Sequence, residues 1–209
     1  MVARPAAPTD AVPVPPIQLR PPGRRFGGPP GGPPGGPPDR PAEDELPPAR
    51  AGGRLVEVVD GVLLATPAGA APHARAARRL GQALEDACEP PLEVFAPFAL
   101  RLAGETELLP DVAVVAVDDP LPRYPRDVRL VAEVLSPRSR RTDVALKARV
   151  YADAGVPLFL VVDPDAVTLV VHELRGDRYV EVGRAARRGA AAVPEPVPVL
   201  LSPADLVRP

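Results

Sequence analysis

The fold is decided by two apolar stretches, PDVAVVAV at residues 110–117 and VRLVAEVLSP at residues 128–137. Both are almost continuously hydrophobic over the length of one strand, which is typical of strands covered on both faces. Each nevertheless carries one carboxylate, Asp111 at the start of the first and Glu133 within the second. Burying a carboxylate is costly unless it is paired or binds a metal. If the two strands are neighbours, both groups can converge at one end of a sheet and share a hard cation such as Mg²⁺.

The segments around these strands indicate a mixed α/β fold. Asp60-Gly61 suits a tight hairpin turn, Pro97 interrupts an apolar run, and Gly155 ahead of Pro157 favours the end of a helix. We therefore expect one central mixed β-sheet with helices packed on it. The expected elements are hairpin strands at 55–59 and 62–65, a helix at 70–87, an interrupted strand at 92–102, strands at 112–117 and 128–135, a helix at 142–154, strands at 158–162 and 167–173, and a final short strand at 179–182.

Proline and glycine are concentrated near the start of the chain. The sequence has 33 prolines and 17 glycines, and about half of the prolines precede residue 50. A repeated Gly-Gly-Pro-Pro unit has no side chains to bury, so residues 1–50 are predicted to be a disordered tail. A spacer is favoured over a docking motif, because no basic pattern flanks the repeat. The ordered domain is expected at 54–205.

Composition restricts the class of protein. The formal net charge is −2 and the pI about 5.8, which argues against a protein that coats nucleic acid through bulk positive charge. An enzyme that engages a phosphodiester locally through a metal is not excluded. Cys88 is the only cysteine, so an intrachain disulfide or a cysteine-based zinc site is excluded. With neither a signal peptide nor a membrane-length apolar run, a cytoplasmic location without membrane contact is expected.

Lys147 is the candidate cation for this site. It follows Asp143 by four residues and precedes Tyr151 by four, so all three share one helix face. Alone, this spacing favours an exposed Asp143–Lys147 ion pair. Together with Asp111 and Glu133 it favours a lysine that stabilises developing negative charge or orients a water molecule.

The order of these motifs resembles the Uma2 family, which belongs to the PD-(D/E)XK restriction-endonuclease-like superfamily. The resemblance covers about residues 54–205 and implies a restriction endonuclease-like core, with a central mixed sheet flanked by helices and a Mg²⁺ or Mn²⁺ site. The segments that carry it are Glu57…Asp60-Gly61, Pro67…His73, Pro110-Asp111, Glu133-Val134-Leu135-Ser136-Pro137 and Asp143…Lys147…Tyr151…Gly155-Val156-Pro157…Val162-Asp163-Pro164.

The resemblance also implies roles for individual residues. Asp111 matches the aspartate of the Pro-Asp motif, and Glu133 matches the acidic residue of the second motif. The lysine usual two positions later is replaced by Leu135, and Lys147 fits a lysine that has moved to the helix. Glu57 resembles an amino-terminal glutamate that can complete the metal site.

Other polar residues are further candidates. His73 could contact a phosphate or the shell of the metal, or it could lie on the surface as a capping residue. Tyr151 shares the helix face of Lys147. Asp163 and Asp165 are best explained as turn residues. The arginine group Arg184, Arg187 and Arg188 is interpreted as a solvated strip, with contact to nucleic acid as the alternative.

The sequence therefore predicts a metal-dependent endonuclease that hydrolyses phosphodiester bonds of nucleic acid, with DNA favoured over RNA. Enzymes of this superfamily often work as dimers, so a homodimer is also expected, although the sequence assigns no surface to it. The first alternative is a catalytically silent module with the nuclease fold, acting in binding or regulation. The second is that Asp111 and Glu133 form structural pairs with Arg129 or Arg138.

Overall fold

The computed structural model describes residues 50–51, 54–67, 71–102, 106–117, 125–136 and 141–208. The Pro/Gly-rich tail predicted at 1–50 lies outside these ranges up to residue 49. No helix in the described ranges is long and apolar enough to cross a bilayer.

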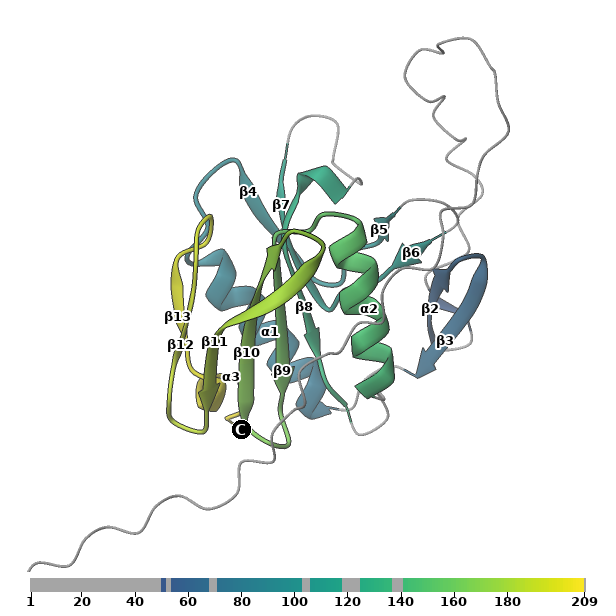
Figure 1. Ribbon diagram of the computed structural model, residues 1–209. Coiled ribbons are helices and arrows are strands. Elements are labelled where there is room, and N and C mark those ends of the chain that lie inside the picture. Colours follow the sequence, from purple (N-terminus) through teal and green to yellow (C-terminus); the bar gives the residue numbers. More distant parts are fainter. Residues whose placement is uncertain are drawn as a thin grey trace, which may run out of the picture. The chain divides into compact units, whose positions relative to one another are not determined.

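A six-stranded mixed sheet forms the centre of the fold (Figure 1). Strands β8 and β9 run parallel, while every other neighbouring pair in this sheet is antiparallel. In spatial order the strands are β11 (Arg178–Ala186), β10 (Thr168–Arg175), β9 (Leu158–Asp163), β8 (Val128–Val134), β7 (Val112–Ala116) and β4 (Leu92–Phe95). The two apolar stretches that dominated the sequence are thus adjacent central strands, preceded on the β8 side by the short 3-10 helix η1 (Pro125–Asp127).

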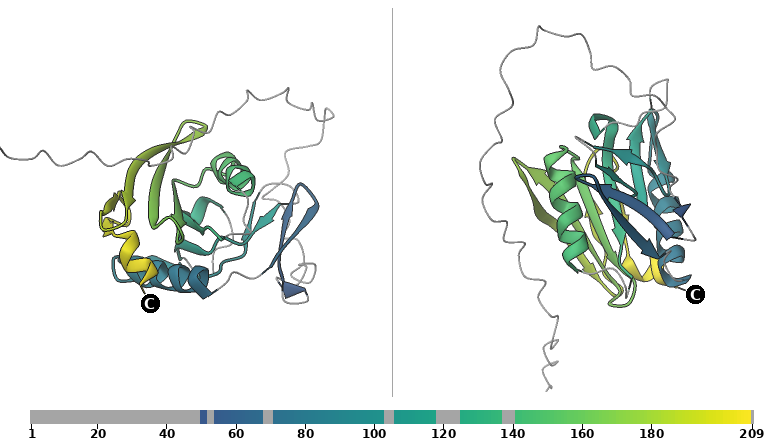
Figure 2. Two further views of the ribbon diagram at one scale, coloured as in Figure 1. Left: turned by 90° about the horizontal axis from the view of Figure 1, so that it is seen from below. Right: turned by 90° about the vertical axis from the view of Figure 1, so that its right-hand side faces the viewer.

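Two helices, α1 (Ala71–Glu85) and α2 (Arg141–Asp153), cover opposite faces of this sheet (Figure 2). Successive side chains of a strand point to opposite faces, so each central strand contributes to two cores. Alternate residues of β7 and β8 pack with Leu80 and Leu84 of α1 on one face. On the other face, Ala148 and Tyr151 of α2 pack with four residues of these strands, Ala113, Val115, Val128 and Val131. This two-sided burial explains why the strand sequences are nearly continuous hydrophobic runs.

A second sheet stands beside the central one. Its strands are β1 (Arg50–Ala51), β2 (Arg54–Val59), β3 (Val62–Pro67), β5 (Leu100–Arg101) and β6 (Glu107–Leu108). The predicted hairpin joins β2 to β3, and both turn residues, Asp60 (φ 50°) and Gly61 (φ 76°), are left-handed. That conformation is the one a two-residue hairpin requires, which explains the Asp-Gly sequence.

Two sequence-based expectations were wrong. The interrupted strand at 92–102 is two strands in different sheets, β4 and β5, separated at Pro97, which has no N–H to continue a ladder. The final short strand at 179–182 is the nine-residue β11. Three elements that were not predicted follow it: β12 (Ala191–Val193), β13 (Val199–Leu201) and α3 (Pro203–Val207). The expected central mixed sheet flanked by helices is confirmed, and two smaller sheets accompany it.

Candidate active site at the end of the central sheet

Asp111 and Glu133 lie on neighbouring strands at one end of the central sheet. Val112 pairs with Ala132 in antiparallel register, so the residue before Val112 is brought beside the residue after Ala132. Oδ2 of Asp111 accepts the backbone N–H of Val134 at 2.8 Å. Glu133 is buried, with 7% of its surface exposed. The fold therefore brings the two carboxylates together, while their role in binding a metal stays a prediction.

Lys147 reaches this position from α2. Its Nζ lies 3.0 Å from both carboxylate oxygens of Glu133 and 2.7 Å from Oε1 of Glu57. The side chain is 16% exposed, so the ammonium is largely removed from water. Lys147 has Glu57 and Glu133 as ion-pair partners. The alternative pair with Asp143 is not tested, because the side chain of Asp143 lies outside the described part of the chain. Lys147 thus bridges two acidic side chains from different sheets.

Glu57 enters the site from β2 in the second sheet. Its Oε1 accepts the backbone N–H of Leu109 at 2.9 Å in addition to its contact with Lys147. Glu57 is 5% exposed. The hairpin that begins the domain therefore contributes a buried carboxylate to the same cluster as the central strands. We call Glu57, Asp111 and Glu133 the carboxylate cluster.

Tyr151 fixes one oxygen of Glu133. It lies one turn after Lys147 on α2, and its hydroxyl donates to Oε1 of Glu133 at 2.8 Å. The α2 helix ends just beyond it, where Gly155 (φ 77°) follows the last turn and the N–H of Val156 donates to the carbonyl of Tyr151. Burial raises the pKa of Tyr151 well above its usual value, so its hydroxyl remains a donor. Glu133 is thus oriented by two groups from one helix face.

His73 approaches from the opposite side of the sheet. Pro72 lies in the first turn of α1, where backbone N–H groups have no acceptor within the helix, so proline is tolerated there. His73 follows it. Nε2 of His73 lies 3.2 Å from Oδ2 of Asp111. The hydrogen bond to Asp111 raises the pKa of His73, and burial opposes that change. His73 is therefore partly buried beside Asp111, and its role in the site stays a prediction.

Negative charge exceeds positive charge around Lys147. Burial raises the pKa of Glu133 to about 7, and Asp111 and Glu57 add to the increase while Lys147 opposes it. Burial lowers the pKa of Lys147, but Glu133 and Glu57 raise it by more, so the net change is upward. The ammonium is therefore held as a cation, and its contacts favour the ionised form of Glu133 against the effect of burial. Glu133 thus interacts with two other carboxylates and with one lysine, and this excess of negative charge would stabilise a further cation.

The donor set fits a hard divalent cation. Within the described ranges, no group of three or more His, Cys, Asp or Glu side chains forms a ready-made metal cage. Mg²⁺ does not require one, because proteins commonly hold it through one or two carboxylates and leave its other positions to water and phosphate. Asp111 and Glu133 supply such a pair of carboxylates, with oxygen donors suited to Mg²⁺ and Mn²⁺.

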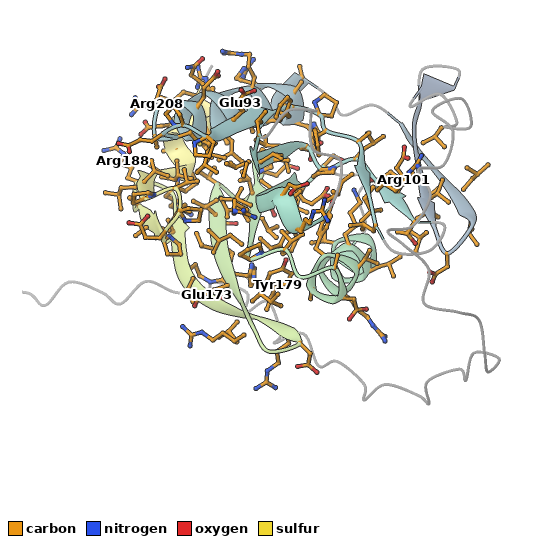
Figure 3. All side chains as sticks on the ribbon, turned by 90° about the horizontal axis from the view of Figure 1, so that it is seen from above. Glu93, Arg101, Glu173, Tyr179, Arg188 and Arg208 are labelled. Atoms are coloured by element: carbon orange, nitrogen blue, oxygen red, sulfur yellow. The ribbon has the colours of Figure 1, made fainter. Side chains whose placement is uncertain are left out.

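Several other candidates do not join the cluster. Arg129 donates to the carbonyl oxygen of Arg126, and Arg138 lies outside the described residues. Oδ1 of Asp163 accepts the N–H groups of residues 165 and 166, which confirms its turn role. Arg184 pairs with Glu181 at 2.6 Å, and Arg188 lies at the periphery of the molecule (Figure 3).

Sequence reasoning missed two features of the site. It did not foresee that backbone N–H groups of Leu109 and Val134 anchor Glu57 and Asp111, because those contacts depend on strand register. It also overlooked a signal that was available. Lys147 is the only lysine among the chain's 25 Lys and Arg residues. Every other basic residue of the Lys/Arg type in this chain is an arginine. A single lysine at a buried position therefore indicates that this position requires a compact ammonium group.

Replacing Tyr151 by Phe tests whether the orientation of Glu133 matters. Loss of a hydrogen bond to a charged group should destabilise the fold by about 1.5–3 kcal/mol. If the site binds a metal, its affinity for Mn²⁺ should fall about 10–100-fold, as is typical when a group that orients a metal ligand is removed. Unfolding in urea and calorimetric titration with Mn²⁺ measure the two effects.

Tyr179→Phe is the matched control. The Tyr179 hydroxyl donates to the carbonyl of Val156 at 2.7 Å, and the residue packs on the α2 side of the sheet (Figure 3). This variant should lose about 0.5–1.5 kcal/mol of stability and keep its metal affinity. Equal loss of metal affinity in both variants would show that Tyr151 acts only through stability.

Comparison with known proteins places the chain in a family. The family model for Uma2, described as "Putative restriction endonuclease", matches residues 44–204. The fold is similar to the crystal structure of a "putative nuclease belonging to DUF820" from Anabaena variabilis ATCC 29413, with a TM-score of 0.58 and 17% identity over 73% of this chain and 89% of that chain. No curated protein matches the chain. Because the family model covers most of the sequence, this chain belongs to the Uma2 family.

Proposed function

We propose that this chain is a Mg²⁺- or Mn²⁺-dependent endonuclease that hydrolyses phosphodiester bonds of nucleic acid, with DNA as the favoured substrate. The observation that carries the proposal is the carboxylate cluster, two of whose members, Glu57 and Glu133, contact the chain's only lysine. Membership of a family described as a restriction endonuclease supports the same class of reaction. A working domain at 54–205 and a cytoplasmic location belong to the proposal.

In this proposal two residues would hold the cation and their neighbours orient them. Asp111 and Glu133 would hold the cation, which when bound polarises a phosphate and lowers the pKa of a water molecule. Tyr151 and Lys147 hold the carboxylate of Glu133 in one orientation, and His73 and the N–H of Val134 do the same for Asp111.

Among the groups that orient Asp111 and Glu133, Lys147 of α2 supplies a lysine ammonium, which carries a full positive charge. Its ammonium can donate to a phosphate oxygen as negative charge develops there. Glu57 holds Lys147 from the far side, 2.7 Å away, and limits how far the ammonium can move. We therefore assign Glu57 first to positioning Lys147 and second to extending the metal site.

The second candidate function is a silent module that keeps the fold without turnover. One observation favours it: Lys147 already satisfies both oxygens of Glu133 and one of Glu57, so the cluster can be stable without a metal. Such a module would bind a partner or nucleic acid without cleaving it. Metal binding and cleavage separate the two candidates.

The test has two arms with the purified full chain. In the first, supercoiled, linear and single-stranded DNA and a structured RNA are incubated with Mg²⁺, with Mn²⁺ and with EDTA. Cleavage that requires the metal is expected, and DNA should be cut before RNA. In the second arm, calorimetry should detect Mn²⁺ binding that weakens at least about tenfold in Glu133→Gln.

Each outcome has a clear meaning. Metal binding without cleavage of any substrate supports the silent module. If the chain neither binds a metal nor cleaves a substrate, the metal-dependent nuclease is ruled out. Cleavage that persists in EDTA contradicts the metal dependence and leaves the assigned roles of Asp111 and Glu133 without support.

A further inference from the structure

Two exposed arginines, Arg187 and Arg188, follow β11 at the end of the central sheet that carries the candidate site. Val134, whose N–H donates to the carboxylate cluster, is in register through β9 and β10 with Ala185, near the end of β11. Arg187 extends this ladder, because its N–H donates to the carbonyl of Val167 at 2.7 Å. The turn after β11 therefore lies at the same edge of the sheet as the carboxylate cluster.

The first half of α1 brings two more arginines to this end of the sheet. The helix begins beside the carboxylate cluster, where His73 contacts Asp111. Arg75 and Arg78 follow within the next turn and a half, on the side of the helix turned away from its buried residues. Arg78 is exposed and Arg75 is partly exposed. Both side chains therefore extend from the outer surface of α1 near the site.

Helix α3 joins these two pairs of arginines. It lies against α1 (Figure 2), and a side-chain nitrogen of Arg79 donates to the carbonyl of Asp205 in α3 at 3.0 Å. The N–H of Ala204, also in α3, donates to the carbonyl of Arg187 at 3.1 Å. The arginines on either side of α3 are called the arginine surface: Arg75, Arg78, Arg187 and Arg188.

The charges of the arginine surface are not neutralised by neighbouring carboxylates. Among the described residues, none of its four members has a carboxylate oxygen within 4.0 Å. Two arginines close to it do have such partners, since Arg184 pairs with Glu181 and Arg208 with Asp205. The arginine surface is thus the part of this region whose positive charge is available to an anionic partner.

The order of charges along α1 is not explained by the stability of the helix. The arginines lie in its first half, and Glu85 and Asp86 lie at its end, away from the site. A helix dipole favours the opposite order, with acidic residues in the first turn and basic residues in the last, and α1 has neither. The arrangement instead concentrates positive charge beside the site, in a chain whose formal net charge is −2.

We propose that the arginine surface binds the phosphate backbone of duplex DNA beside the candidate site. A guanidinium group can donate two parallel hydrogen bonds to one phosphate, which suits this contact. Proteins that bind single strands commonly stack the bases on aromatic side chains. All five described Phe and Tyr side chains pack in the core on the α2 side of the sheet, so the arginine surface offers no such platform.

The inference rests on nucleic acid as the ligand in the proposed function, and it assigns the surface that positions this ligand. Contacts to phosphates fix the place of a duplex on the protein but carry no direct sequence information. The arginine surface would therefore bind duplexes of different sequence equally well. Its binding needs no metal, so it is measured separately from cleavage.

Fluorescence anisotropy of a labelled DNA duplex, with the full chain in EDTA over a series of salt concentrations, tests the proposal. Each phosphate contact contributes about 0.9 to the steepness with which log affinity falls with log salt concentration. The double variants Arg187→Ala/Arg188→Ala and Arg75→Ala/Arg78→Ala should each lower this steepness by about 1.8. At 0.1 M salt each should bind about 10–100-fold more weakly than the wild type.

Arg149→Ala/Arg178→Ala is the matched control, because it removes the same charge from two other exposed arginines. Arg149 lies on α2, and Arg178 begins β11 at the end opposite Arg187. This variant should keep the affinity and the salt dependence of the wild type. Circular dichroism should be the same for all four proteins, because every replaced side chain lies at least partly on the surface.

Three results would overturn the proposal: a wild type that does not bind the duplex, surface variants that bind it as the control does, or tighter binding of a single strand of the same length. None of these results depends on cleavage, so the proposed nuclease is judged by its own assay. Weaker binding in both surface variants, with no cleavage under any condition, would support the arginine surface and contradict the nuclease.

Discussion

Replacing Lys147 by Met should destabilise the fold by about 3–5 kcal/mol, the usual cost of removing one partner of a buried ion pair. Methionine keeps most of the apolar stem and removes the charge. Glu57 and Glu133, whose side chains are only 7% and 9% exposed, would then face each other without a cation between them. Any nuclease activity should fall about 10²–10³-fold, as when a donor to developing charge is lost.

Two comparisons identify the cause of that loss. Arg149→Met, two residues along the same helix, removes an exposed guanidinium 3.8 Å from Asp153 and should change stability by less than about 0.5 kcal/mol. Adding Glu133→Gln to Lys147→Met removes a stranded carboxylate, so the double variant should be more stable than Lys147→Met alone. Urea unfolding of the four proteins measures these differences. A Lys147→Met variant as stable as Arg149→Met would mean that the ammonium is not buried between the carboxylates.

The elements around the candidate site were predictable from the sequence because local chemistry specifies them. Asp60-Gly61 suits a single turn type, and Gly155 marks the end of α2. The two central strands are buried on both faces and read as apolar runs. Each of these signals lies within a few residues of the structure it determines, so no knowledge of the tertiary fold was needed.

The contacts that complete the site were not predictable in this way. Glu57 comes from the second sheet and Lys147 from the helix α2, and their 2.7 Å contact depends on how the second sheet packs beside α2. The link between His73 and Asp111 likewise joins the first turn of α1 to the end of a strand. The short strands β12 and β13 were missed because stretches rich in alanine and proline show neither helical nor strand periodicity.

Asp111→Asn should abolish metal-dependent cleavage while leaving the fold intact. Asparagine keeps an oxygen that can accept the N–H of Val134, which Asp111 accepts at 2.8 Å. It removes the negative charge that a divalent cation requires, so Mn²⁺ affinity and activity should each fall by at least about 100-fold. Losing a group that only orients a metal ligand costs up to about 100-fold, and losing a ligand's charge should cost at least as much. Without metal, stability should be unchanged or higher, because fewer like charges crowd the cluster.

Asp111→Ala distinguishes the charge of Asp111 from its role as a hydrogen-bond acceptor. Alanine removes the charge as asparagine does, but it also leaves the N–H of Val134 without its acceptor, which should cost about 1–3 kcal/mol. The two variants should therefore be equally inactive and differ in stability. The opposite pattern, in which Asp111→Asn keeps full activity and Asp111→Ala loses it only as far as it unfolds, would make Asp111 a structural residue. Glu133 would then be left without a partner ligand, and the silent module would become the better account of the site.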